Sequence, residues 1–314
     1  MRRALITILA IGAVSSLGAQ QPQPPALETL RVQGNVYAIF GAGGNVTVQV
    51  GNDGVLVVDS GLATTASALL AEIRKLSNGP IRFIVNTHVH PDHVGGNAAF
   101  SGPPADPLQP LNIIAHGNVL NRMVKALPPL QPGQTGGSER LRGMPIDEYF
   151  APTKDMRFNN EAVVLYHEPN AHTDGDTTVL FRGSDVVSAG DIFTPDAYPF
   201  IDVAGGGSVA GEIAALNHIL LLAVPGHTEE GGTYIIPGHG RICDEADVVE
   251  FRDMIVIIRD RVQDMINKKA TLDQIKSARL TRDYDPGYVM PTSFVKADQF
   301  VEAIYKSLTA AGTK

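Results

Sequence analysis

The sequence has almost no cysteine, so disulfides cannot hold its fold together. Its 314 residues include one cysteine, Cys243. A chain with one cysteine forms no intramolecular disulfide, so a large apolar core has to stabilise it. Hydrophobic residues make up 44% of the sequence, enough for such a core in one domain or in a two-lobed one. We interpret Cys243 as a small residue of this core.

Basic residues are also scarce relative to acidic ones. The chain carries 25 lysines and arginines against 33 aspartates and glutamates, a formal net charge of −8. Nucleic-acid binding relies on clustered positive charge, so a nucleic-acid partner is not expected. After the first twenty residues, no apolar run is long enough to cross a bilayer. The expected partner is a small-molecule substrate, and the oligomeric state is left open.

The start of the chain has the pattern of a secretory signal peptide. A short basic segment, 1–3, precedes the apolar segment 4–17, and Gly18-Ala19 follows. We expect cleavage after Ala19, a flexible Pro/Gln-rich leader over 20–30, and a periplasmic or secreted protein without membrane association. Cleavage would remove two arginines and make the net charge more negative by two. An uncleaved anchor is the alternative.

The densest group of metal-ligand side chains lies in residues 88–93, which read His-Val-His-Pro-Asp-His. Neutral imidazole and carboxylate suit zinc and neighbouring divalent metals. On a helix, His88 and His90 would point to different faces, and Pro91 would interrupt the helix, so we expect the whole motif on a loop. The β-branched, apolar run 81–86 just before it predicts a buried strand. A ligand-bearing loop at the end of a buried strand is a common position for a site in α/β folds.

Four further polar positions each follow or end a predicted strand. Asp59 ends a hairpin over 45–58, built around the turn 51–54. His172 follows a strand at 162–167, Asp191 follows one at 186–188, and His239 follows one at 233–236. Strands are also expected at 112–115 and 177–181, and helices after Thr64 or Thr65 and at 119–127. Taken singly these positions are weak signals, and their value lies in their order along the chain.

In that order, the motifs resemble those of the metallo-β-lactamase superfamily over roughly residues 34–241. The resemblance implies a four-layer αβ/βα sandwich, with two mixed sheets face to face, helices outside, and a dinuclear metal centre at one edge. We expect a catalytic domain at 31–243, with a lid-like loop at 128–143 that is rich in proline and glycine. A plain disordered insertion would look the same as that lid. The remaining chain, 244–314, predicts helices that pack on the sandwich, with Asp244, Thr271 and Ser293 as caps.

The resemblance also implies a role for each motif residue. His88, His90 and His172 would hold the first metal, and Asp92, His93 and His239 the second. Asp191 would bridge the two, and Asp59 would orient the imidazoles from beneath. Pro225-Gly226-His227 duplicates the tripeptide that contains His239, but His239 is preferred because it follows an apolar strand. His116, His167 and His218 are interpreted as structural or surface histidines.

The implied function is an exported hydrolase with two zinc ions, with iron or manganese as alternatives. A metal-bridging hydroxide would attack the carbonyl of an ester, lactone, thioester or amide, and Asp92 would orient it and relay its proton. Asp191 stands where the best-known penicillin-destroying subclass has a cysteine, and no lysine follows it. A periplasmic β-lactamase is therefore the alternative rather than the first choice. A mono-iron sulfur dioxygenase of the same superfamily is the second alternative, and a non-catalytic metal-binding or partner-binding protein is a third.

Overall fold

A computed structural model describes residues 26–101, 110–130, 138–228, 231–290 and 293–311. The proposed signal peptide and most of the leader lie outside these residues, as does 131–137 of the predicted lid. Among the described helices, none combines the length and apolar character needed to cross a membrane.

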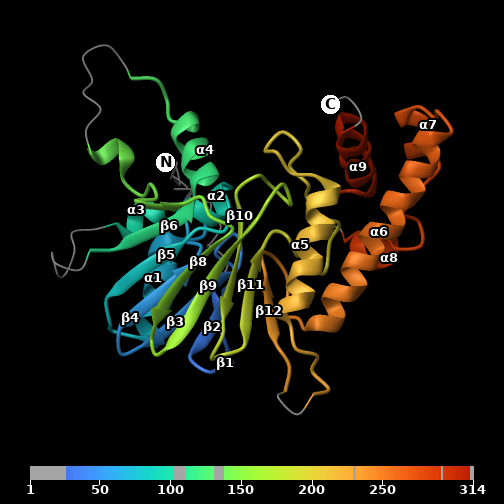
Figure 1. Cartoon of the computed structure of the whole chain (residues 1–314). Coiled ribbons are helices and arrows are strands. Elements are labelled where there is room, and N and C mark those ends of the chain that lie inside the picture. The colour runs from blue at the N-terminus through green and yellow to red at the C-terminus, as the bar shows by residue number, and fades with distance from the viewer. Residues whose placement is uncertain (1–25, 102–109, 131–137, 229–230, 291–292, 312–314) are drawn as a thin grey trace, which may run out of the picture.

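Two mixed sheets lie face to face, as the sequence predicted (Figure 1). The first has seven strands in chain order, with antiparallel pairing through β4 and parallel pairing from β4 to β7. Its strands are β1 (Glu28–Gln33), β2 (Val36–Phe40), β3 (Val46–Gly51), β4 (Gly54–Val58), β5 (Ile81–Val85), β6 (Asn112–His116) and β7 (Asp147–Tyr149).

The second sheet has five strands in the order β12-β11-β10-β9-β8, in which only β11 and β12 pair in parallel. Its strands are β8 (Thr153–Phe158), β9 (Glu161–Glu168), β10 (Asp176–Phe181), β11 (Val186–Gly190) and β12 (Tyr234–Pro237). All the strands predicted from apolar runs are present. Strands β1, β2, β7 and β8 were not predicted. The sequences of β1, β7 and β8 mix charged and apolar residues, whereas β2 is a short apolar run of five residues.

Alternation along the strands divides the apolar side chains between two core layers. In β9, Val163 and Leu165 face the opposite sheet, whereas Val164 faces away from it. In β10, Phe181 faces the other sheet and Leu180 faces outward. Each sheet therefore has a second apolar face, which has to be covered by helices.

Helices cover those two outer faces. On the first sheet, α1 (Ala66–Leu76) buries Leu69 and Ile73 against β3, β4 and β5. On the second sheet lie α5 (Val209–Leu222), α6 (Glu245–Asn267) and α9 (Ala297–Ala311), as Figure 1 shows. The shorter helices are α2 (Pro91–Val94), α3 (Asn97–Phe100), α4 (Gly117–Ala126), α7 (Leu272–Ser277), α8 (Asp285–Tyr288) and the 3-10 turn η1 (Ser138–Leu141). The four-layer sandwich with C-terminal helices is confirmed.

The helix caps agree with the sequence at two of four positions. Asp244 and Thr271 form complete capping boxes at the starts of α6 and α7. Thr65 occupies the N-cap position of α1, but its hydroxyl donates to the carbonyls of Ala42 and Leu62 instead of capping the helix. The Ser293 prediction is wrong, because the last helix begins only at Ala297.

The start of α9 is stabilised from inside the chain segment 296–299. The side chain of Gln299 accepts from the backbone N–H of Lys296, whose carbonyl accepts from Gln299 and Phe300. Ser293 instead accepts from the backbone N–H of Met290, in a separate local turn. That turn lies next to the candidate site described below.

Candidate metal centre

The seven predicted ligands come together at one edge of the two sheets. His88 and His90 lie just after β5, and His172 lies between β9 and β10. Asp191 and His239 directly follow the parallel strands β11 and β12. Because parallel strands end at the same edge of a sheet, Asp191 and His239 meet there. The facing sheet brings His88 to the same edge.

One part of the histidine motif differs from the prediction. Residues 91–94 form the one-turn helix α2, so Asp92 and His93 lie on a helix rather than on a loop. Pro91 occupies its first turn, where the missing N–H costs nothing and the fixed φ favours the helix. His90, in extended conformation, is the residue before this helix.

We call the first set of ligand side chains the inner group: His88, His90, His172 and Asp191. Nδ1 of His90 lies 3.1 Å from Nε2 of His88 and 2.9 Å from Nε2 of His172. The Oδ2 atom of Asp191 lies 3.9 Å from Nε2 of His88 and 3.8 Å from Nε2 of His172. Three imidazole nitrogens and one carboxylate oxygen thus surround one point.

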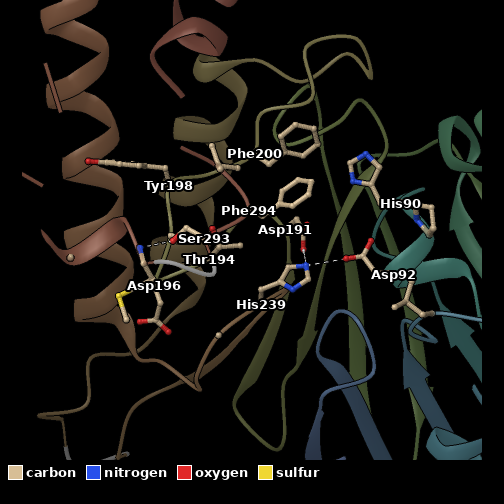
Figure 2. Close-up of a pocket in the computed structure, with 17 residues that line it drawn as sticks. His90, Asp92, Asp191, Thr194, Asp196, Tyr198, Phe200, His239, Ser293 and Phe294 are labelled. Carbon is tan, nitrogen blue, oxygen red and sulfur yellow. Dashed lines mark hydrogen bonds and ion pairs between the residues drawn. The ribbon is translucent and has the colours of Figure 1, made fainter. Parts of the chain in front are cut away.

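The second set, Asp92, His93 and His239, is called the outer group. Oδ2 of Asp92 contacts Nε2 of His239 (Figure 2), at a distance of 3.2 Å. The same oxygen lies 3.6 Å from Nε2 of His93. The other oxygen of Asp191, Oδ1, lies 3.1 Å from Nε2 of His93 and 3.5 Å from Nε2 of His239. Asp191 therefore presents one carboxylate oxygen to each group.

Asp59 anchors the outer group from below. Its Oδ2 atom lies 2.7 Å from Nδ1 of His93 and also accepts from the hydroxyl of Thr87, while its Oδ1 atom accepts from the backbone N–H of Thr87. Asp59 has a φ of 64°, an uncommon conformation for a residue other than glycine. These contacts fix both the ring of His93 and Thr87, the residue just before the histidine motif.

Each inner histidine is anchored through its second ring nitrogen. Nδ1 of His88 lies 3.0 Å from the hydroxyl of Thr87, and Nδ1 of His172 bonds the carbonyl oxygen of Phe200. Nε2 of His90 lies 3.2 Å from Oδ2 of Asp202. Phe200 and Asp202 were not predicted as site residues, because they follow no strand and belong to no motif.

Two glycines allow the strands to approach the ligands closely. A Cβ atom on Gly238 would lie 2.0 Å from Oδ1 of Asp191, and one on Gly44 would lie 2.6 Å from Cε1 of His93. Any larger residue at either position would displace a ligand side chain. The glycine of the Pro-Gly-His pattern that contains His239 is therefore required for steric reasons.

Two inner histidines, His88 and His172, favour the neutral, metal-binding form. Burial lowers the pKa of His88 well below its ordinary value and lowers the pKa of His172 to about 4. Nearby imidazoles add to this effect, because positive charges so close together repel each other. Metal at these positions would not have to displace protons at neutral pH.

The outer group has a different charge balance. Burial alone would lower the pKa of His239, but its neighbours Asp191 and Asp92 raise it to about 9. Burial alone would raise the pKa values of both carboxyls. The imidazoles of His93 and His239 outweigh it, so both pKa values fall below the ordinary range. Without metal, the outer group is thus an ion-pair cluster that a metal would have to deprotonate.

The other histidines lie elsewhere. His227 is exposed, on the loop between α5 and β12. The rings of His116 and His167 stack on each other with 3.6 Å between centroids, and His218 lies 2.6 Å from Glu168. Cys243 is buried and bridges the backbone of Ile235.

Comparisons with known proteins agree with this geometry. A family model described as the metallo-beta-lactamase superfamily matches residues 39–108, which include the histidine motif. Over 49 residues the chain is 49% identical to a linear primary-alkylsulfatase from Pseudomonas sp. (strain ATCC 19151). That stretch covers 15% of this chain and 9% of the relative.

Solved structures resemble the whole described fold at low sequence identity. A stereoselective inverting sec-alkylsulfatase from Pseudomonas sp. matches with a TM-score of 0.67 and 16% identity, over 89% of this chain and 50% of that one. A metallo-beta-lactamase from Pontibacter korlensis matches with a TM-score of 0.56 and 15% identity, over 73% and 98%. The chain thus spans about half the length of the alkylsulfatase structure it matches.

The predicted resemblance to the metallo-β-lactamase superfamily is confirmed: residues 39–108 match its family model, and the fold and the two ligand groups agree with that match. The clustered histidines and aspartates are of the type that holds metal ions.

Proposed function

We propose that the chain is a dinuclear metal-dependent hydrolase, with zinc as its metal. The arrangement of Asp191 carries the proposal, because its two oxygens face two separate ligand groups. Nε2 of His93 and Oδ1 of Asp191 are also buried and lie 3.1 Å apart, but the geometry of a hydrogen bond is not met at either atom among the described residues. Polar atoms in that state are costly unless a further partner, such as a metal, satisfies them.

The residues around the two groups fit that role. Two divalent ions, when bound, would supply a hydroxide near neutral pH and polarise the bond to be cleaved. Asp92 lies at the cavity side of the outer group with a pKa below its ordinary value, so it is ionised at neutral pH. As a base, it can take a proton from the attacking water and pass it to the leaving group.

We propose ester-type carbonyl substrates, including lactones and thioesters. In such a reaction a water oxygen bonds to the carbonyl carbon, the bond from that carbon to the leaving atom breaks, and the leaving group receives a proton. Asp191 is a carboxylate where the dedicated antibiotic-hydrolysing subclass has a thiolate, and Ile192-Phe193 follow it without a lysine. β-Lactam turnover is therefore expected to be weak.

Sulfate-ester hydrolysis is the second candidate. The local identity to a primary-alkylsulfatase and the structural match to a sec-alkylsulfatase favour it. The one-iron sulfur dioxygenase is less favoured, because a complete outer group would then have no metal to hold.

Metal analysis and a substrate panel test these candidates together. Purified protein should contain about two zinc ions per chain, and chelation should abolish turnover. The panel is p-nitrophenyl butyrate, a lactone, a thioester, octyl sulfate and a chromogenic cephalosporin. One iron per chain would reject the dinuclear hydrolase. A kcat/KM above about 10⁵ M⁻¹s⁻¹ on the cephalosporin or on octyl sulfate, with nothing comparable on esters, would reject the carbonyl preference.

We also propose that the protein is exported, with cleavage after Ala19. The support is the sequence pattern of residues 1–19 alone. N-terminal sequencing of the protein from a periplasmic fraction should begin at Gln20. An intact Met1 in the membrane fraction would indicate an uncleaved anchor.

A further inference from the structure

A large cavity opens over the outer group. It has a volume of about 840 Å³, within the range of small-molecule sites. His90, Asp92, Asp191 and His239 line one side of it (Figure 2). The opposite side is apolar, and comes from the segment after β11 and from the chain between α8 and α9. Its main side chains are Tyr198, Phe200, Met290, Phe294 and Val295, and Leu62 adds to the cavity lining from the loop between β4 and α1.

Three of these large apolar side chains are exposed to solvent: Phe294 is 83% exposed, Met290 54% and Phe200 40%. The rings of Phe200 and Phe294 contact each other edge to face, with 5.7 Å between centroids. Phe200 also lies 5.8 Å from the ring of His90. Exposed apolar surface grouped beside polar, reactive side chains is typical of a substrate site.

The cavity has an acidic lining apart from its imidazoles, of which His239 has a pKa raised to about 9 in the absence of metal. Its described lining includes three aspartates, Asp92, Asp191 and Asp196, and no lysine or arginine. The nearest arginine in sequence is Arg241, directly after the lining residue Gly240. Its guanidinium makes two hydrogen bonds with Asp247, of 2.6 and 2.9 Å. An anionic group far from the two ligand groups would therefore meet the carboxylate of Asp196. Among these residues it would meet no cation without a carboxylate partner, because Arg241 is paired with both Asp247 and Asp196.

We propose that this apolar wall holds the uncharged, hydrophobic part of an ester substrate, and that Phe294 is a main determinant of chain-length preference. The reaction in this inference rests on the proposed hydrolytic function, whereas the binding surface does not depend on it. An ester with a medium-length alkyl chain would place its carbonyl over the two ligand groups and its chain against Phe200, Met290 and Phe294. A carboxylate at the far end of that chain would oppose binding.

The binding surface can be tested without catalysis. Nile red, a neutral apolar dye, is titrated into the metal-free full-length protein and its fluorescence is followed. Phe294→Ala should weaken binding about three- to tenfold, since it removes part of the apolar contact area. The matched control is Phe150→Ala, because Phe150 is also largely exposed but does not line the cavity. Equal dye affinity in the Phe294 variant and the wild type would overturn the inference.

The substrate preference is tested with zinc-loaded protein and three p-nitrophenyl esters: acetate, hexanoate, and the adipate monoester, which has a carboxylate at its far end. Each buried methylene can contribute about threefold, so kcat/KM for hexanoate should exceed that for acetate by at least about tenfold. Hexanoate should exceed the adipate by a similar factor. Phe294→Ala should reduce both ratios, whereas Phe150→Ala should leave them as in the wild type.

The outcomes separate the two proposals. Ester hydrolysis that is independent of chain length, or equal for hexanoate and adipate, overturns the inference while the hydrolase proposal stands. Absence of ester hydrolysis, together with a dye-binding loss in Phe294→Ala, supports the apolar surface and overturns the carbonyl substrate. Both variants change exposed side chains, so misfolding is not expected to obscure the comparison.

Discussion

The inner and outer ligand groups share Asp191 but differ in charge, although each contains both buried and partly exposed ligands. His172 of the inner group has a fully buried side chain, whereas the side chain of His239 in the outer group is 41% exposed. Burial keeps the inner imidazoles His88 and His172 neutral, whereas Asp92 and Asp191 favour a protonated His239. The inner group is therefore prepared for metal before metal arrives. The outer group faces the cavity and has to exchange protons for metal.

With this difference, one centre can both retain a metal ion and leave another accessible to water and substrate. A buried, neutral donor set suits a tightly held ion. A partly exposed set beside a cavity leaves room for water and substrate. The predictions below test whether the two groups differ in this way, beginning with the largest expected effect.

The strongest test removes the exposed outer ligand. His239→Ala should lower metal content from about two ions per chain to about one and abolish most ester hydrolysis, while the fold persists. The matched control is His227→Ala, which changes an exposed histidine in the duplicate tripeptide and should leave the stoichiometry unchanged. Elemental analysis after dialysis measures both. The assignment of His239 fails if only the His227 variant loses metal.

Asp92 tests whether the outer group also handles protons. Asp92→Asn keeps the size of the side chain but removes the base, so kcat should fall about 10²- to 10⁴-fold with metal partly retained. Asp253→Asn is the control, because Asp253 lies exposed on α6 and, among the residues that the structure describes, pairs with the neighbouring Arg252 alone. A kcat loss below about tenfold in Asp92→Asn would remove Asp92 from the mechanism.

The carboxylates behind the ligands should have smaller effects. Asp59, which is buried, makes three hydrogen bonds beneath His93, whereas Asp202 is half-buried and contacts His90 among the ligands. Loss of such a partner typically weakens metal binding 10- to 100-fold. Asp59→Asn should lie near the upper end of that range and Asp202→Asn near the lower end, measured by competition with a chromophoric chelator. The reverse order would contradict the importance of burial.

The smallest effect concerns acid stability outside the metal centre. Burial lowers the pKa of His167 to about 4, and the stacked ring of His116 adds to this effect. The unfolded chain takes up this proton near pH 6.5, so the stability contribution is complete above about pH 6.5 and is lost as pH falls toward 4. His167→Gln should remove that dependence.

Urea unfolding of metal-free protein at pH 7 and pH 5 measures this change. The drop in unfolding free energy between the two pH values should be smaller in His167→Gln than in the wild type. An equal drop would show that His167 stays charged or solvated in the folded chain.

Much of the fold was predictable from local patterns. Alternating apolar residues and the capping sequences at Asp244 and Thr271 predicted most strands and two helix starts, because these interactions join residues close in sequence. Helix α5 was not predicted, because its sequence is apolar on nearly every side and therefore shows no amphipathic pattern. Ser293 failed as a cap because Gln299 stabilises the helix start from within.

The sequence by itself determined the chemistry of the ligands, because the histidine motif places several metal-ligand side chains within a few residues. It also determined the order in which further donors follow strands. Only the tertiary structure decided which groups complete the site. Asp202 meets His90 across 112 residues, and the wall containing Phe294 combines the segment after β11 with the chain between α8 and α9. Such contacts depend on how sheets and helices stack, and a local residue pattern contains no information about that stacking.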